Sequence, residues 1–126
     1  RSKEIFEQRR NICLLYDSSF KNLSRISPLS VNYSETIPFM YVIKLKIGQR
    51  DSFMDYLKRK GVGTGVHYIP NHQHPYFQKY VKNDLPISDQ IGEQIVTLPL
   101  FYGMTDDDIE QVIRAVTDFE SFEESN

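Results

Sequence analysis

The sequence predicts a small α+β domain in which about three short strands, forming an antiparallel or mixed sheet, pack against helices on one side. Three observations support this fold class. Apolar residues recur at helical spacing near both ends of the chain, which indicates an opening and a closing helix. Residues 39–47 change to a period of two, and residues 95–98 form a second β-rich run.

The chain opens with an amphipathic helix over residues 2–23. Its apolar positions share one face, at Ile5, Ile12, Leu15, Tyr16 and Phe20. Residues 24–38 are rich in Ser, Asn and Pro, and this composition predicts a loop.

The clearest strand covers residues 39–47. Ile43, Leu45 and Ile47 fall on one face, and Lys44 and Lys46 fall on the other. Residues 65–68 are expected to form a short strand that delivers His67 and Tyr68 to an edge, and residues 95–98 a further brief strand.

Three further helices have local signals. Residues 50–60 bury a stripe of Phe53, Tyr56 and Leu57, and Gly61 follows as a C′ stop. Pro75 begins a short helix or turn that runs to Tyr80. Ser88 is expected to cap residues 89–94.

The final helix begins after Thr105, which acts as its N-cap, and residues 106–108 place three aspartates at its positive end. Its core-facing residues are Ile109, Val112, Ile113 and Val116. The preceding run, residues 99–104, is predicted to be a loop.

Composition narrows the class of protein. A chain of 126 residues is one domain or part of a larger one, and its net charge of −2 gives no electrostatic footprint for nucleic acid or an anionic membrane. No apolar run has membrane-spanning length. The single cysteine, Cys13, excludes an internal disulfide and is expected to be a buried thiol in a reducing cytoplasm. Because the chain opens at Arg1 in the body of a helix, we expect a fragment.

Residues 61–76 carry the strongest functional signal, since they combine three glycines, all three histidines, two prolines and two tyrosines. Glycine allows close approach of backbone to ligand, while imidazole and phenol groups supply hydrogen bonds. The favoured interpretation is a polar ligand pocket. Two alternatives stay open: a metal site built from His67, His72 and His74, and histidines that only hydrogen-bond within the loop. The glycine spacing does not match a nucleotide-binding fingerprint.

Three ordered motifs resemble the C-terminal small domain of DegT/StrS-type sugar aminotransferases, and together they cover nearly the whole chain. They are Arg10…Tyr16, the run Arg50-x6-Leu57-x3-Gly61-Val62-Gly63-Thr64-x-Val66-His67-Tyr68-x-Pro70-x-His72-x-x-Pro75-Tyr76, and Leu98-Pro99-Leu100-Phe101-x3-Thr105. The resemblance implies that residues 1–126 form the small domain of a fold-type I enzyme that depends on pyridoxal 5′-phosphate. Such enzymes aminate a keto sugar carried on a nucleotide diphosphate, for lipopolysaccharide, glycan or antibiotic-sugar biosynthesis.

The resemblance also implies which residues touch the substrate: Thr64, His67, Tyr68, Pro70, His72 and Tyr76. No catalytic residue is expected in this chain, because the family's Schiff-base lysine and cofactor site belong to an N-terminal domain absent from it. The isolated chain is therefore expected to be inactive. The resemblance also implies an amino donor such as glutamate and a homodimer in the intact enzyme. A cytoplasmic location and the lack of a nucleic-acid, membrane or metal partner are expected from the composition and from the residues themselves. The rival hypothesis is a stand-alone α+β module that binds a small ligand or metal through the His67, His72 and His74 loop.

Overall fold

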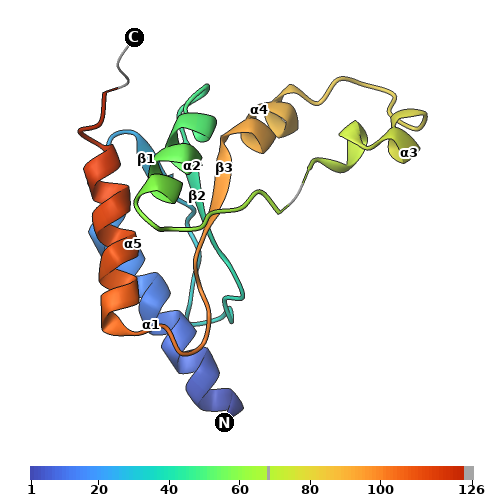
Figure 1. The fold of residues 1–126 in the computed structure, drawn as a ribbon. Helices are drawn as coiled ribbons and strands as arrows, with labels where there is room; N and C mark the ends of the chain where they lie inside the picture. Colours follow the sequence, from blue (N-terminus) through green and yellow to red (C-terminus); the bar gives the residue numbers. More distant parts are fainter. Residues whose placement is uncertain (68, 124–126) are drawn as a thin grey trace.

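A computed structural model describes residues 1–67 and 69–123. Within these ranges it contains five α-helices, one 3-10 helix and a three-stranded antiparallel sheet, which confirms the predicted α+β class. The elements, shown in Figure 1, are α1 (Ser2–Phe20), β1 (Ile26–Pro28), β2 (Tyr41–Leu45), α2 (Arg50–Arg59), the 3-10 helix η1 (Asn71–Gln73), α3 (Pro75–Gln78), α4 (Pro86–Gln94), β3 (Ile95–Leu98) and α5 (Asp106–Phe119).

The sheet has the strand order β1-β2-β3, with Ile26 opposite Leu45 and Tyr41 opposite Leu98. Alternate residues of β2 are buried, and they face the layer formed by α1, α2 and α5. Helices α1 and α5 lie against each other beside the sheet (Figure 1). The period of two read from the sequence therefore marks the face of β2 that the helices cover.

Aromatic rings fill the space between the helices and the sheet. The Phe53 and Phe119 rings meet edge to face with centroids 5.1 Å apart, a favoured geometry for aromatic pairs. The Tyr16 hydroxyl, although buried, donates a hydrogen bond to the Pro99 carbonyl at 2.8 Å. The largest fully buried side chains are Tyr16, Tyr41, Phe20, Phe53, Phe119, Ile26, Ile43, Leu45, Leu57, Leu98, Val96 and Val116.

Cys13 is a buried thiol within this core, as predicted. Burial raises the pKa of the thiol to about 11, and a hydrogen bond with Tyr33 only partly opposes the shift. Because the thiolate is the reactive form of cysteine, the geometry assigns Cys13 a packing role.

The local helix signals are largely confirmed. Gly61 ends α2 with φ of 80°, the left-handed conformation that favours glycine. At α5, the Thr105 hydroxyl accepts from the Asp108 amide at 3.1 Å and the Asp108 carboxylate accepts from the Thr105 amide at 2.9 Å. This reciprocal pair is a capping box, so the predicted N-cap is correct.

Three strand predictions were wrong in detail. Strand β1 lies inside the predicted loop, because a three-residue strand has too little periodicity to detect and forms only by pairing with β2. Ile47 lies beyond the end of β2 and is exposed. In place of the strand expected over residues 65–68, Gly65 makes a single bridge to Thr97, and Tyr68 lies outside the described residues.

The predicted cap of α4 was also wrong. Ser88 lies within the helix, and Leu85 is the N-cap. Pro86 occupies the first turn, where the absent N–H of proline costs no hydrogen bond and its fixed φ suits a helix.

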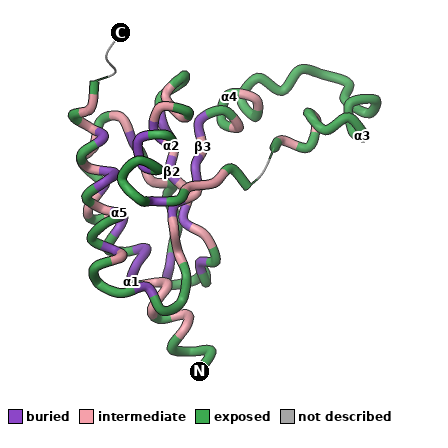
Figure 2. The backbone as a smooth tube through the Cα atoms, in the orientation of Figure 1, coloured by how far each residue is buried: buried purple, intermediate pink, exposed green. Residues whose placement is uncertain are grey.

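Residues 69–85 form an arm that leaves the sheet layer and returns into α4. The arm contains η1 and α3, which pack on each other, and Figure 1 shows it projecting away from the layer formed by α1 and α5. Nearly all of it is exposed, as the green tube of Figure 2 shows. Because so little of the arm is buried, its position depends on the contacts that it makes where it joins the rest of the fold.

Candidate functional site

A cavity of about 500 Å³ opens at the end of the sheet where β2 begins and β3 ends. We call it the sheet-end cavity. The loop that follows α2 forms one wall, and the segments flanking the two strands form the other. Its lining residues are Phe39, Met40, Gly63, Thr64, Gly65, His67, Thr97, Leu98, Pro99 and Leu100.

The turn after α2 delivers the polar residues to this cavity. The left-handed Gly61 reverses the chain, and the Val62 amide donates to the Leu57 carbonyl at 2.8 Å. Two backbone hydrogen bonds then hold Gly65 to Thr97, at 3.1 and 2.8 Å. The loop is thus fixed at one end by a helix stop and at the other by the sheet.

Gly65 is required for the position of the His67 ring. A Cβ atom on Gly65 would lie 2.8 Å from His67 Cε1, closer than real Cβ contacts allow. The absence of a side chain therefore lets the imidazole fold back against the backbone at the cavity.

Thr64 and His67 are the two members of the predicted site that line the sheet-end cavity. One offers a hydroxyl and the other an imidazole, while most of the remaining lining is apolar. A cavity that is mainly apolar with a few placed polar groups suits a small organic ligand. This arrangement can bind and orient a polar molecule.

The arm holds Pro70, His72 and Tyr76, which the structure does not bring into the sheet-end cavity. Tyr76 is 67% exposed, and its ring meets Phe77 edge to face. Tyr68 lies outside the described residues. The six predicted residues thus include two in the cavity, three on the arm and one whose place is not described.

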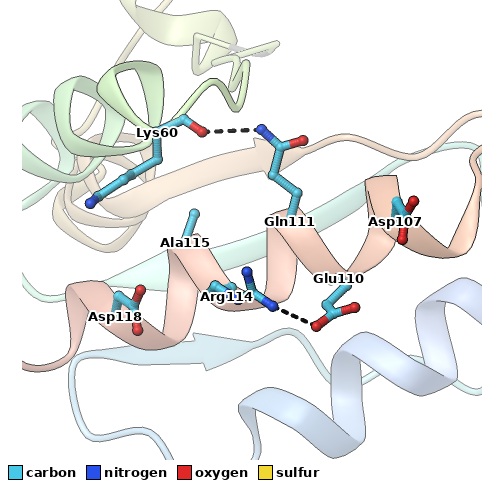
Figure 3. Close-up of a pocket in the computed structure, with 7 residues that line it drawn as sticks. All are labelled: Lys60, Asp107, Glu110, Gln111, Arg114, Ala115 and Asp118. Carbon is cyan, nitrogen blue, oxygen red and sulfur yellow. Dashed lines mark hydrogen bonds and ion pairs between the residues drawn. The ribbon is translucent and has the colours of Figure 1, made fainter.

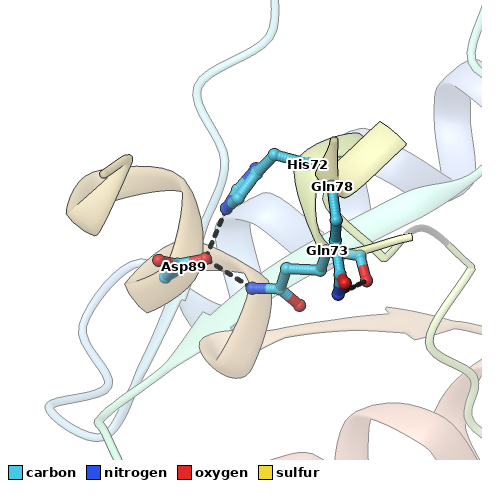
Figure 4. Close-up of polar contacts among 4 residues, drawn as sticks. All are labelled: His72, Gln73, Gln78 and Asp89. Carbon is cyan, nitrogen blue, oxygen red and sulfur yellow. Dashed lines mark hydrogen bonds and ion pairs between the residues drawn. The ribbon is translucent and has the colours of Figure 1, made fainter. Parts of the chain in front are cut away.

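His72 is engaged by an acid that the sequence pattern did not single out. Its Nε2 lies 2.5 Å from Oδ1 of Asp89 in α4, and the Gln73 side-chain amide donates to the same oxygen (Figure 4). These hydrogen bonds, from Gln73 first and His72 second, lower the pKa of the Asp89 carboxyl. The sequence pattern did not connect Asp89 with His72, because two predicted breaks separate these residues, and only the return of the arm brings them together.

The histidines do not gather around a common point. His72 faces Asp89, His67 lies at the sheet-end cavity, and His74 occupies the N-cap position of α3 without a side-chain capping hydrogen bond. Among residues 1–67 and 69–123, no group of three or more His, Cys, Asp or Glu side chains is arranged to hold a metal ion. The three histidines of the metal hypothesis therefore lie at separate places in the fold.

A second cavity of about 430 Å³ lies between the end of α2 and α5, and several of its polar groups pair with each other. Arg114 binds Glu110 at 2.6 Å, and the Gln111 side chain donates to the Lys60 carbonyl at 3.1 Å (Figure 3). The ion pair joins residues one helical turn apart on an exposed surface, where such pairs add little stability. This cavity is a solvated helix surface, and it contains none of the site residues predicted from the sequence.

Comparisons with known proteins identify the family. The sequence model of the DegT/DnrJ/EryC1/StrS aminotransferase family matches residues 1–117. The chain belongs to this family. The uncharacterized protein MJ1066 of Methanocaldococcus jannaschii is 34% identical over 122 residues, which is 90% of this chain and 32% of that protein. The dTDP-3-amino-3,6-dideoxy-alpha-D-galactopyranose transaminase of Aneurinibacillus thermoaerophilus is 29% identical over 111 residues, covering 87% of this chain and 30% of that enzyme.

Solved structures confirm the fold. The sugar aminotransferase CalS13 from Micromonospora echinospora superimposes with a TM-score of 0.84 over 94% of this chain and 31% of its own, at 23% identity. The chain thus spans about a third of the length of the relatives it matches. Its α+β architecture is that of a part of a fold-type I sugar aminotransferase. Along the described residues, no helix has the length and apolar character that crossing a bilayer requires.

Enzymes of this family depend on pyridoxal phosphate, which supplies an electron sink for carbanion chemistry. The residues of the sheet-end cavity do not fit as anchors for that group. Of its lining residues, none is a lysine that could bond the aldehyde and none is an acid that could pair with the pyridine nitrogen.

Proposed function

We propose that this chain is the substrate-covering small domain of a pyridoxal-phosphate-dependent aminotransferase. The substrate is a keto sugar carried on a nucleotide diphosphate, and the product serves polysaccharide, glycan or antibiotic-sugar synthesis. The observation that carries the proposal is the sheet-end cavity, where the family's glycine- and histidine-bearing run places Thr64 and His67 together without an amine. The relative named as a dTDP-amino-sugar transaminase supports this substrate class.

In this proposal the chain positions substrate and breaks no bond. Thr64 and His67 hydrogen-bond the sugar or its phosphates at the cavity wall, which is orientation of the kind that lowers the entropy cost of reaction. Pro70, His72 and Tyr76 contact the substrate from the arm, outside the sheet-end cavity, and Tyr68 contacts it as well. The cofactor and the lysine that binds it belong to an N-terminal domain outside these residues, so the isolated chain is inactive.

The same proposal assigns partners to the intact enzyme. Glutamate is the amino donor that the family resemblance implies, and a cytoplasmic homodimer is its implied state. Sedimentation of the full-length enzyme measures the assembly, and a monomer at working concentration contradicts that part.

The test uses the full-length enzyme with Thr64→Val and His67→Gln. Each variant removes a hydrogen bond to substrate, so we expect kcat/KM for the nucleotide keto sugar to fall about tenfold, the equivalent of ~1.4 kcal/mol. Cofactor absorbance should not change, because neither residue anchors the cofactor. His74→Asn is the matched control, since His74 lies outside the sheet-end cavity.

Two outcomes contradict the proposal. Unchanged kinetics in both cavity variants would remove the substrate role from this wall. Cofactor binding and turnover by the isolated chain would show that the chain is a complete enzyme. A Zn²⁺-dependent rise in the melting temperature of the isolated chain would instead favour the rival binding module.

A further inference from the structure

Two residues of α4, Asp89 and Gly92, contact the first part of the arm, residues 70–73. We call this pair the seat of the arm. Asp89 and Gly92 are three positions apart on a helix and therefore lie on the same side of it. The Asp89 carboxylate receives the His72 ring and the Gln73 amide (Figure 4). At Gly92 a Cβ atom would lie 2.7 Å from Pro70 Cγ, so the bare helix backbone is what admits the proline.

The seat is itself fixed to the folded layer. The Arg50 guanidinium of α2 donates to the Gly92 carbonyl. The buried Gln94 side chain donates to the Leu45 carbonyl of β2 at 2.7 Å. A chain of hydrogen bonds therefore runs from α2 and β2 through α4 to the arm.

Asp89 also decides which nitrogen of His72 a ligand can meet. An ionised carboxylate can only accept a hydrogen bond, so its partner nitrogen must carry a proton. The contact with Asp89 therefore places the imidazole proton of His72 on Nε2. His72 is held with its side chain only 14% exposed, and Nδ1 remains as the nitrogen without this partner. A carboxylate behind a histidine fixes its tautomer and ring orientation in this way.

We propose that Asp89 is a positioning residue, which sets the tautomer of His72 and holds the arm in place for substrate binding. The inference rests on the proposed function, because it gives His72 a role toward the sugar substrate. It differs from that function in assigning the carboxylate behind the imidazole, a residue that does not itself meet substrate. Gly92 serves the same seat through its lack of a side chain.

The first test needs no substrate. In Asp89→Ala, we expect the ¹⁵N spectrum of the His72 ring to lose its single Nε2-protonated form and to show both tautomers. Amide hydrogen exchange over residues 70–78 should quicken about tenfold, while exchange in β2 and β3 should not change. Asp89→Asn keeps an acceptor oxygen and should restore most of both signals. Asp84→Ala, which removes an exposed acid of the arm outside the seat, is the matched control.

The second test measures kinetics in the full-length enzyme. Because the seat positions substrate, Asp89→Ala should raise KM for the nucleotide keto sugar about tenfold with a smaller change in kcat, and Asp89→Asn should recover it. If Asp89→Ala changes neither the His72 tautomer nor the amide exchange of residues 70–78, Asp89 does not hold the arm. Altered tautomer and exchange with an unchanged KM would overturn the positioning role. A wild-type enzyme that does not turn over a nucleotide keto sugar would instead refute the proposed function, and the substrate-free measurements would still judge the seat.

Discussion

Replacing Gly61 with alanine should destabilise the turn that begins the sheet-end cavity wall. Gly61 has φ of 80°, where a side chain costs about 1–2 kcal/mol. The new Cβ would also lie 2.9 Å from Gln111 Nε2, which must move and weaken its hydrogen bond to Lys60, a loss of about 0.5 kcal/mol on an exposed surface. Reduced entropy of the unfolded chain returns about 0.4–1 kcal/mol. The net expected loss is about 0.5–2 kcal/mol.

Equilibrium unfolding of the chain in urea measures this difference, and the midpoint should fall by about 1 M for a slope typical of small proteins. Gly63→Ala is the matched control. Gly63 has no positive φ, and a Cβ atom added there would meet no described atom within 4 Å, so its replacement should leave stability equal or slightly higher. If Gly61→Ala proves as stable as Gly63→Ala, the assignment of a strained helix stop is wrong.

Three further outcomes follow from buried or capping groups. Tyr16→Phe leaves the Pro99 carbonyl without its donor and should cost about 1–3 kcal/mol in urea unfolding; a neutral result would mean that water replaces the hydroxyl. Thr105→Ala removes the hydroxyl that accepts from the Asp108 amide, and the free energy of unfolding should fall by about 0.5–2 kcal/mol. Circular dichroism follows the loss of helix, and an unchanged stability would contradict the capping box. Cys13, with its pKa raised to about 11, should react with iodoacetamide at pH 8 at least ~10-fold more slowly when folded than in urea, and more quickly as the pH rises towards 11. Equal rates would show that the thiol is accessible.

The candidate site shows how far sequence reasoning reaches. Thr64 and His67 belong to a run rich in glycine, histidine and proline, and the structure places both at one cavity. His72 comes from the same run, yet its carboxylate partner Asp89 lies 17 residues away. No local pattern marks such a pair, because it depends on an arm that leaves the sheet and returns.

The sequence by itself determined the features that a few neighbouring residues control. The Thr105 cap, the Gly61 stop and the alternation in β2 each follow from backbone geometry and from the burial of one face, so each can be read from spacing. Only the tertiary structure decided the features that need a distant partner. Strand β1 forms because β2 offers it a ladder, and the seat of the arm forms because α4 meets residues 70–73. Such contacts form between residues that are far apart in the chain, so the local spacing of residue types does not reveal them.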